Sequence, residues 1–196
     1  VGINSIEHFV GDYALDQELT FGGIGEDTGK KVAIIGGGPA GLAAAFQLRR
    51  LGHGATIFDD HDSLGGMMRY GIPGYRTPRD VLDGEVKRIT DMGVEVVLGT
   101  RVGRDIPMQK IEDDYDAIVI AIGAKQGSAL PFPGAEKANN CISGVAFLEA
   151  FNQGRLQYGS QRVLVIGGGD TAMDVAAVAR RLGHITKVSE KDRPEM

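Results

Sequence analysis

The sequence has very little cysteine, no tryptophan and no long hydrophobic run. Cys141 is the single cysteine among 196 residues, so the chain contains no internal disulfide, no redox-active cysteine pair and no complete cysteine-ligated iron–sulfur site. No stretch approaches the roughly 18 apolar residues of a membrane span, and the N-terminus lacks the pattern of a signal peptide. We therefore expect a cytoplasmic protein with no membrane partner.

Positive charge is also scarce. The chain has 21 Lys and Arg residues against 26 Asp and Glu residues, which gives a net charge of −5. Because no basic excess is available to neutralise phosphates, we do not expect nucleic acid as a partner. Glycine, in contrast, is abundant at 30 residues, and it is used where the backbone turns sharply or approaches a ligand closely.

The first cluster of glycines lies between a predicted strand and a predicted helix. Residues 31–35 form an apolar, branched run suited to a buried parallel strand, and residues 39–51 have the alanine-rich character of a tightly packed helix. Gly52 ends that helix, and a second strand begins over residues 55–58. This order predicts the opening of a β-α-β unit.

The glycine spacing in the intervening turn is that of a dinucleotide-binding fingerprint. Gly36 permits the tight turn, Gly38 lets a pyrophosphate approach the backbone, and Gly41 has no side chain to hold the helix off the sheet. The dipole and amide groups at the helix start favour phosphates. Eighteen residues after Gly41, Asp59 ends the second strand, where its carboxylate can accept hydrogen bonds from both ribose hydroxyls. The alternative is a plain strand-to-helix turn beside a surface acid.

Strands and helices alternate on either side of this unit. A short N-terminal helix is expected at residues 4–10, capped by Asn4 or Ser5, with a packing face of apolar residues at helical spacing. That face comprises Ile6, Phe9, Val10 and Tyr13. Further strands are predicted at residues 94–98 and 117–122, and further helices at residues 77–93 and 143–152, capped by Thr77 and Ser143. The alternation predicts an α/β fold with a doubly wound, Rossmann-like domain.

The opening pattern is repeated at the end of the chain. Residues 31–60 align without a gap to residues 162–191, with 11 identities in 30 positions. A repeat of this length, restarting at a strand over residues 162–166, predicts two nucleotide-binding domains. Because so short a second domain cannot bury its own sheet, we expect the chain to be part of a longer protein.

Several motifs resemble one flavoprotein family. The run Val32 to Leu42 resembles the FAD fingerprint of two-dinucleotide-domain flavoproteins. Residues 64–67 and 70–73 are similar to the flavin-side loop of the glutamate synthase small-subunit family, which includes related NAD(P)H-to-ferredoxin transfer subunits. Residues 121–124 match that family's Ala-Thr-Gly segment with isoleucine in place of threonine, and residues 167–174 are similar to its nicotinamide-domain fingerprint.

The resemblance implies two cofactor sites and a division of the chain. Residues 1–29 are an N-terminal helix and linker, residues 30–155 the front part of an FAD-binding domain, and residues 156–196 the start of an NAD(P)-binding domain. The FAD-binding residues implied are Gly36, Gly38, Pro39, Ala40, Gly41, Asp59, Gly66, Met67, Ile72, Pro73 and Gly123. The nicotinamide-cofactor residues implied are Gly167, Gly169, Asp170, Thr171, Ala172 and Glu190.

The choice between NAD and NADP depends on Glu190. It lies eighteen residues after Ala172 and is the counterpart of Asp59 in the repeat. A carboxylate there suits the free ribose hydroxyls of NAD and repels the extra phosphate of NADP, so the sequence favours NAD. The neighbouring Lys187 and Lys191 weaken this argument, and Glu190 can equally be an exposed acid in a turn.

The implied reaction passes a hydride from NAD(P)H to FAD, and then electrons to an iron–sulfur protein or subunit within a hetero-oligomeric complex. Because cofactors carry such chemistry, no catalytic acid, base or nucleophile is expected, and no residue spacing suggests a metal site. Two alternatives are considered. A dithiol reductase shares both fingerprints but needs a cysteine pair that this chain lacks. A flavin-bearing scaffold subunit without nicotinamide reactivity shares every motif.

Overall fold

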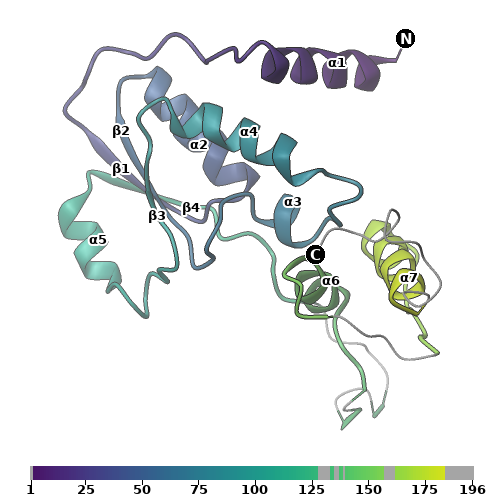
Figure 1. The fold of residues 1–196 in the computed structure, drawn as a ribbon. Helices are drawn as coiled ribbons and strands as arrows, with labels where there is room; N and C mark the ends of the chain where they lie inside the picture. The colour runs from purple at the N-terminus through teal and green to yellow at the C-terminus, as the bar shows by residue number, and fades with distance from the viewer. Residues whose placement is uncertain (1, 128–132, 135–136, 139, 157–161, 184–196) are drawn as a thin grey trace. The chain divides into compact units, whose positions relative to one another are not determined.

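The computed structural model describes residues 2–127, 133–134, 137–138, 140–156 and 162–183. They form two compact units, which we describe separately (Figure 1). The sheet unit comprises residues 1–66 and 78–123, and the helical unit comprises residues 67–77 and 124–196.

The sheet unit is built on four parallel strands. In chain order these are β1 (Lys31–Ile35), β2 (Gly54–Phe58), β3 (Glu95–Val97) and β4 (Ala117–Ile120), and their order in the sheet is β3-β2-β1-β4. The sequence runs outward from β1 through β2 to β3 and then returns to place β4 on the other side of β1. Ligands of doubly wound sheets bind at such a reversal, beyond the carboxyl ends of the strands.

Helices cover both faces of this sheet. On one face, α2 (Pro39–Arg50) and α4 (Arg79–Thr90) enclose a core that includes Ile34 and Ile57, both fully buried. On the other face lies α5 (Met108–Asp114) (Figure 1). Its Ile111 packs against Ala33 and Phe58 of the sheet. Successive residues of β1 and β2 thus face opposite sides, as alternation along a strand requires. The α/β, doubly wound class predicted from the sequence is confirmed.

Two helix starts differ from the sequence prediction. The N-terminal helix α1 (Ile3–Asp16) has Gly2 as its N-cap, and neither Asn4 nor Ser5 caps it because both lie inside the first turn. Pro78, rather than Thr77, is the N-cap of α4, with no side-chain cap bond. Helical geometry is unfavourable for Thr77, because it precedes a proline. Pro78 itself has a non-helical ψ of 137°, so the helix begins at Arg79.

The apolar stripe of α1 is exposed, which contradicts its expected packing role. Its members range from 52% exposed at Tyr13 to 68% exposed at Phe9. The helix instead meets α4 through its C-terminal end, where Ala14 is buried and Leu15 lies against Gly84. Only the last turn of α1 therefore contributes to packing within the described part of the sheet unit.

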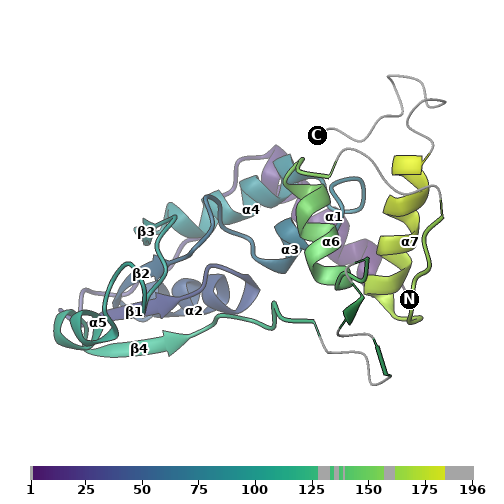
Figure 2. The same cartoon turned by 90° about the horizontal axis from the view of Figure 1, so that it is seen from below.

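The helical unit contains α3 (Met67–Tyr70), α6 (Gly144–Asn152) and α7 (Asp170–Gly183). The helices α6 and α7 lie side by side (Figures 1 and 2) and share a core of apolar residues. The buried members of that core are Leu148, Phe151, Val175, Val178 and Leu182. Ser143 caps α6 as predicted, because its Oγ accepts a hydrogen bond from the Ala146 N–H at 3.2 Å.

The strand predicted over residues 162–166 is not formed. Val163, Leu164 and Ile166 are exposed, from 47% at Val163 to 86% at Leu164, whereas Val165 is half-buried against the core of α6 and α7. A strand needs a hydrogen-bonded neighbour, and none lies beside this segment among the residues described. The helix of the repeat is nevertheless in place, since α7 begins 131 residues after α2, as the alignment requires. None of the helices described is long and apolar enough to cross a membrane.

Burial in the sheet unit makes a testable contrast between two isoleucines. Ile57 is fully buried, whereas Ile6 on α1 is 55% exposed. We expect Ile57→Ala to lower the free energy of unfolding by about 2–5 kcal/mol, because it leaves a cavity in the core. The matched Ile6→Ala should change it by less than about 0.5 kcal/mol. Urea unfolding of the intact protein measures both, and equal losses would contradict the exposed placement of α1.

Candidate functional site

Three glycine-bearing turns meet at the carboxyl edge of the sheet. They are residues 36–38 after β1, residues 64–66 after β2, and residues 121–123 after β4. The Gly65 N–H donates to the Gly37 carbonyl at 2.8 Å, which joins the first two turns. A Cβ on Gly66 would lie 2.7 Å from the Gly38 Cα. The first two turns are therefore in backbone contact at Gly38 and Gly66, where no side chain fits, and the buried Leu64 side chain packs against Gly37.

The first turn also depends on glycine for its own geometry. Gly36 has a φ of +108°, and a Cβ there would collide with the carbonyl of Ala121. A Cβ on Gly41 would collide with the Gly36 carbonyl oxygen, so this glycine allows α2 to pack closely against β1. Gly38 is the N-cap of α2 and Pro39 is its first residue. The amides of the first turn of a helix have no partner within the helix and face the end of β1.

Asp59 lies at the end of β2 and is bound to the first glycine turn. Its side chain is buried, and its Oδ2 accepts a hydrogen bond from the Gly37 N–H at 2.6 Å. Its Oδ1 accepts from the backbone N–H of His61 at 2.9 Å. The carboxylate is thus held by backbone donors on two sides, while a carboxylate has about four acceptor positions in all.

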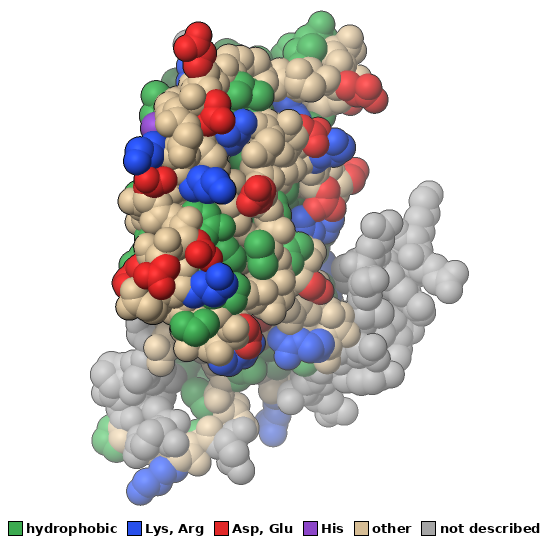
Figure 3. Space-filling model, turned by 90° about the vertical axis from the view of Figure 1, so that its left-hand side faces the viewer, with side chains coloured by type: hydrophobic (Ala, Val, Ile, Leu, Met, Phe, Trp, Pro, Cys, Tyr) green, Lys and Arg blue, Asp and Glu red, His purple; other side chains and the backbone are tan. Residues whose placement is uncertain are grey.

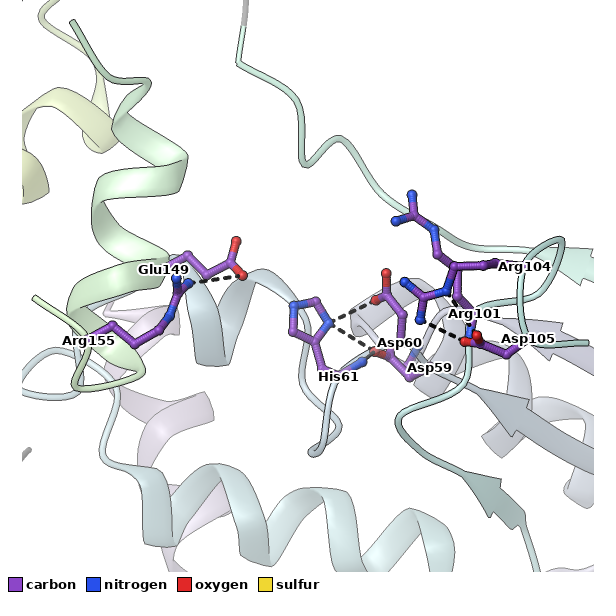
Figure 4. Close-up of polar contacts among 9 residues, drawn as sticks. Asp59, Asp60, His61, Arg101, Arg104, Asp105, Glu149 and Arg155 are labelled. Atoms are coloured by element: carbon purple, nitrogen blue, oxygen red, sulfur yellow. Dashed lines mark hydrogen bonds and ion pairs between the residues drawn. The ribbon is translucent and has the colours of Figure 1, made fainter. Parts of the chain in front are cut away.

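His61 also contacts this carboxylate, and the sequence patterns did not single it out. Its Nδ1 lies 3.1 Å from Oδ1 of Asp59 and 3.1 Å from Oδ1 of Asp60 (Figure 4). Because carboxylates only accept hydrogen bonds, Nδ1 must carry the proton that it shares with them. The acid-x-His spacing directly after a predicted strand is the signal in the sequence that could have indicated this contact. These three side chains are close enough to share one cation, but they are already paired with one another.

The turn after β3 also lies beside Asp59. The Thr100 N–H donates to the Asp59 carbonyl at 2.9 Å, and residues 101–105 follow. In that segment the Arg104 guanidinium makes two hydrogen bonds to Asp105, at 2.9 and 2.8 Å (Figure 4). These bonds, with the Arg101 backbone N–H, lower the pKa of Asp105 to about 2.

The remaining predicted FAD residues divide between the two units. Gly123 has a φ of +68° and is exposed just beyond β4 in the sheet unit. In the helical unit, Met67 begins α3, and its carbonyl accepts hydrogen bonds from the Gly71 and Ile72 N–H groups, both at 3.0 Å. Ile72 is half-buried and Pro73 is fully buried. Pro39 and Ala40 are exposed at the start of α2.

The second fingerprint has the same turn but a more open surrounding. Gly167 has a φ of +126°, matching Gly36, and Asp170 begins α7. A Cβ on Gly169 would meet no atom within 4 Å, and one on Gly167 would lie 3.6 Å from the Cβ of Ala172. The side chains of this turn are mostly exposed. Glu190, with Lys187 and Lys191, lies outside the described residues.

Charged side chains of both signs are interspersed on the face in Figure 3, among the residues described. The parallel sheet, the glycine-bearing turns at its carboxyl edge and the buried Asp59 together define a dinucleotide-binding α/β protein with a Rossmann-like fold. A family model described as pyridine nucleotide-disulphide oxidoreductase matches residues 30–195. The chain belongs to this family.

Individual relatives agree with this assignment. The chain is 44% identical over 181 residues to the NADP(+)-dependent formate dehydrogenase subunit beta of Moorella thermoacetica, covering 88% of this chain and 26% of the relative. It is 36% identical over 211 residues to the glutamate synthase (NADPH) small chain of Escherichia coli (strain K12), covering 100% of this chain and 44% of the relative. The resemblance to glutamate synthase small chains predicted from the motifs is confirmed.

A solved structure shows the same fold. FprA from Mycobacterium tuberculosis in complex with NADPH matches with a TM-score of 0.64 at 22% identity, covering 76% of this chain and 36% of that chain. At this identity the likeness concerns the fold. The chain spans about a quarter to a half of the length of the curated relatives named above.

The close approach at Gly41 gives a direct test of the first fingerprint. We expect Gly41→Ala in the intact protein to lower the bound flavin content severalfold, because the methyl group forces α2 away from Gly36. Gly11→Ala on α1 is the control, since a Cβ at Gly11 meets nothing within 4 Å. Flavin absorbance per protein measures both variants, and unchanged flavin in Gly41→Ala would contradict the close packing.

Asp105 gives a test of the electrostatics beside Asp59. Because its folded pKa is lowered, its contribution to stability is present above the unfolded pKa of about 3.9 and is lost as pH falls through about 2. We expect Arg104→Gln to move the Asp105 titration midpoint upward, toward the unfolded value. Carboxyl chemical shifts followed by NMR measure the midpoint, and a midpoint that stays near 2 would contradict the role of Arg104.

Proposed function

We propose that this chain is the cofactor-binding part of a flavoprotein oxidoreductase subunit. The whole subunit would pass a hydride from NAD(P)H to FAD and electrons onward to an iron–sulfur partner, as in glutamate synthase small subunit-like proteins. The observation that carries the proposal is the edge of the sheet, where three glycine-bearing turns and the first turn of α2 meet beside the buried Asp59.

This edge fits the phosphate and ribose portions of FAD. The start of α2 offers backbone amides and the positive end of a helix dipole to a pyrophosphate. The Asp59 carboxylate, already held by Gly37 and His61, keeps acceptor capacity for a ribose hydroxyl. When bound, the flavin supplies the hydride acceptor and the means to release electrons onward. The resemblance assigns Met67, Ile72 and Pro73 to the flavin side, and Gly123 to the same cofactor.

The second fingerprint is proposed to hold the nicotinamide cofactor. Gly167, Gly169 and the first turn of α7 repeat the geometry of the first turn and helix start. Asp170, Thr171 and Ala172 line that helix start. For cofactor choice, Glu190 favours NAD, whereas the two relatives named above carry NADP or NADPH in their names. We keep NAD as the proposal, because a carboxylate at this position repels the extra phosphate.

The electron acceptor is proposed to be an iron–sulfur protein or subunit in a hetero-oligomeric complex. A single cysteine leaves this chain without a cluster site of its own. Both curated relatives are named as a subunit or a small chain of a larger enzyme. The division into residues 1–29, 30–155 and 156–196 is retained as part of the proposal.

Anaerobic reduction of the intact protein tests this function. We expect NADH or NADPH to bleach the flavin absorbance, with NADH the faster of the two. Gly167→Val should slow this reduction at least tenfold, because valine does not tolerate a φ of +126°, and should leave the flavin content unchanged. Gly168→Ala is the matched control, since a Cβ there meets nothing within 4 Å.

Two results would count against the proposal. If dithionite reduces the flavin but neither nicotinamide does, the chain belongs to a flavin-bearing scaffold and the reductase function is wrong. If NADPH reduces the flavin much faster than NADH, the reductase stands and the interpretation of Glu190 is wrong.

A further inference from the structure

The segment Met67–Thr77 belongs structurally to the helical unit. It leaves α3 at Tyr70, which is buried, and the Tyr70 carbonyl accepts a hydrogen bond from the Asn152 side-chain amide of α6 at 2.9 Å. This segment carries the residues that resemble a flavin-side loop. The bond from Asn152 to Tyr70 holds this segment against α6. The segment also contacts α7, the helix that begins at the second fingerprint, in two places.

An ion pair joins the end of this segment to α7. The Nη1 of Arg76 lies 2.6 Å from both carboxylate oxygens of Asp174. The Asp174 side chain is only 9% exposed, whereas that of Arg76 is 50% exposed. A nearly buried carboxylate is costly unless it is paired, so the pair holds Arg76 against the helix.

A second contact involves the neighbouring residue of the segment and a residue two turns further along α7. The Arg181 guanidinium lies 3.8 Å from the centre of the Tyr75 ring, a cation–π distance. Asp174 and Arg181 are seven residues apart, which places them on one face of α7 two turns apart. Two neighbouring residues of the segment, Tyr75 and Arg76, are thus held at two points along the same helix face.

The Arg76–Asp174 pair joins two elements that contact different cofactors in the proposed function. Ile72 and Pro73, on the flavin side, are three or four residues before Arg76 in the segment. Asp170, at the start of α7 beside the proposed nicotinamide dinucleotide, is one turn before Asp174. A displacement at the pair therefore changes the placement of one cofactor's contacts relative to the other's.

We propose that Arg76 and Asp174 are positioning residues for hydride transfer, which fix the flavin-side segment to the helix that binds the nicotinamide cofactor. The proposal rests on the proposed function above. Transfer between two bound partners is sensitive to their alignment, and a misplacement of about 1 Å can lower the rate about a hundredfold. Neither residue exchanges a proton or forms a bond in this role.

The test measures flavin reduction by saturating NAD(P)H in the intact protein under anaerobic conditions. We expect Arg76→Gln and Asp174→Asn each to lower the limiting rate about 10–100-fold. The apparent affinity for the nicotinamide cofactor should change less than about threefold, because its own contacts are untouched. The double variant should be no slower than the slower single variant, as expected for two residues acting through one contact.

Further variants separate positioning from a purely structural role. Arg76→Lys should recover most of the rate, because a single ammonium group can bridge both carboxylate oxygens as Nη1 does. Reduction by dithionite and the flavin content should match the wild type in Arg76→Gln, whereas the thermal midpoint should fall, because the variant leaves the nearly buried Asp174 carboxylate without its partner. Lys110→Gln, which breaks an exposed ion pair with Asp114 on α5, is the control and should keep the wild-type rate.

A wild-type rate in both Arg76→Gln and Asp174→Asn would overturn the positioning role while the proposed function stands. An effect confined to cofactor affinity, or a loss that Arg76→Lys does not recover, would also overturn it. If the wild-type flavin is not reduced by either nicotinamide, the proposed function itself fails, and the two failures are thereby distinguished.

Discussion

The close approach of α2 to β1 is the constraint on which the sheet unit depends. Gly41 must lack a side chain because the carbonyl oxygen of Gly36 occupies the space that a Cβ would take. Gly36 in turn needs a positive φ and lies against Ala121 at the end of β4. This contact brings the first turn of α2 to the edge of the sheet, where its amides can meet an anionic group. The bond from Gly37 to Asp59 then fixes an acid beside those amides.

Much of this arrangement could be predicted because it is local. A branched run, a glycine turn at fixed spacing and an alanine-rich helix specify one another within about twenty residues, so the strands, the turn and the position of Asp59 follow from the sequence. The contact of His61 with Asp59 could not be predicted with the same ease. It depends on the backbone bending back after β2, which places the His61 N–H and Nδ1 against one carboxylate oxygen.

The errors of prediction arise where a segment needs a neighbour distant in sequence. Residues 162–166 have the composition of a buried strand but no hydrogen-bonded partner in the described part of the chain. Their apolar run alone therefore wrongly predicts a strand. The apolar stripe of α1 has helical spacing but only its last turn meets α4. The pairing of Arg76 with Asp174 spans 98 positions and has no signature in either local sequence.

The central claim is that the carboxyl edge of this sheet binds a flavin dinucleotide. A structure of the intact protein with FAD bound tests it most directly. The account predicts the pyrophosphate over residues 36–41, within hydrogen-bond distance of the first-turn amides of α2, and a ribose hydroxyl donating to Asp59. A flavin whose pyrophosphate and adenosine ribose lie away from this edge, or a bound flavin that leaves Asp59 without a ribose contact, would contradict it.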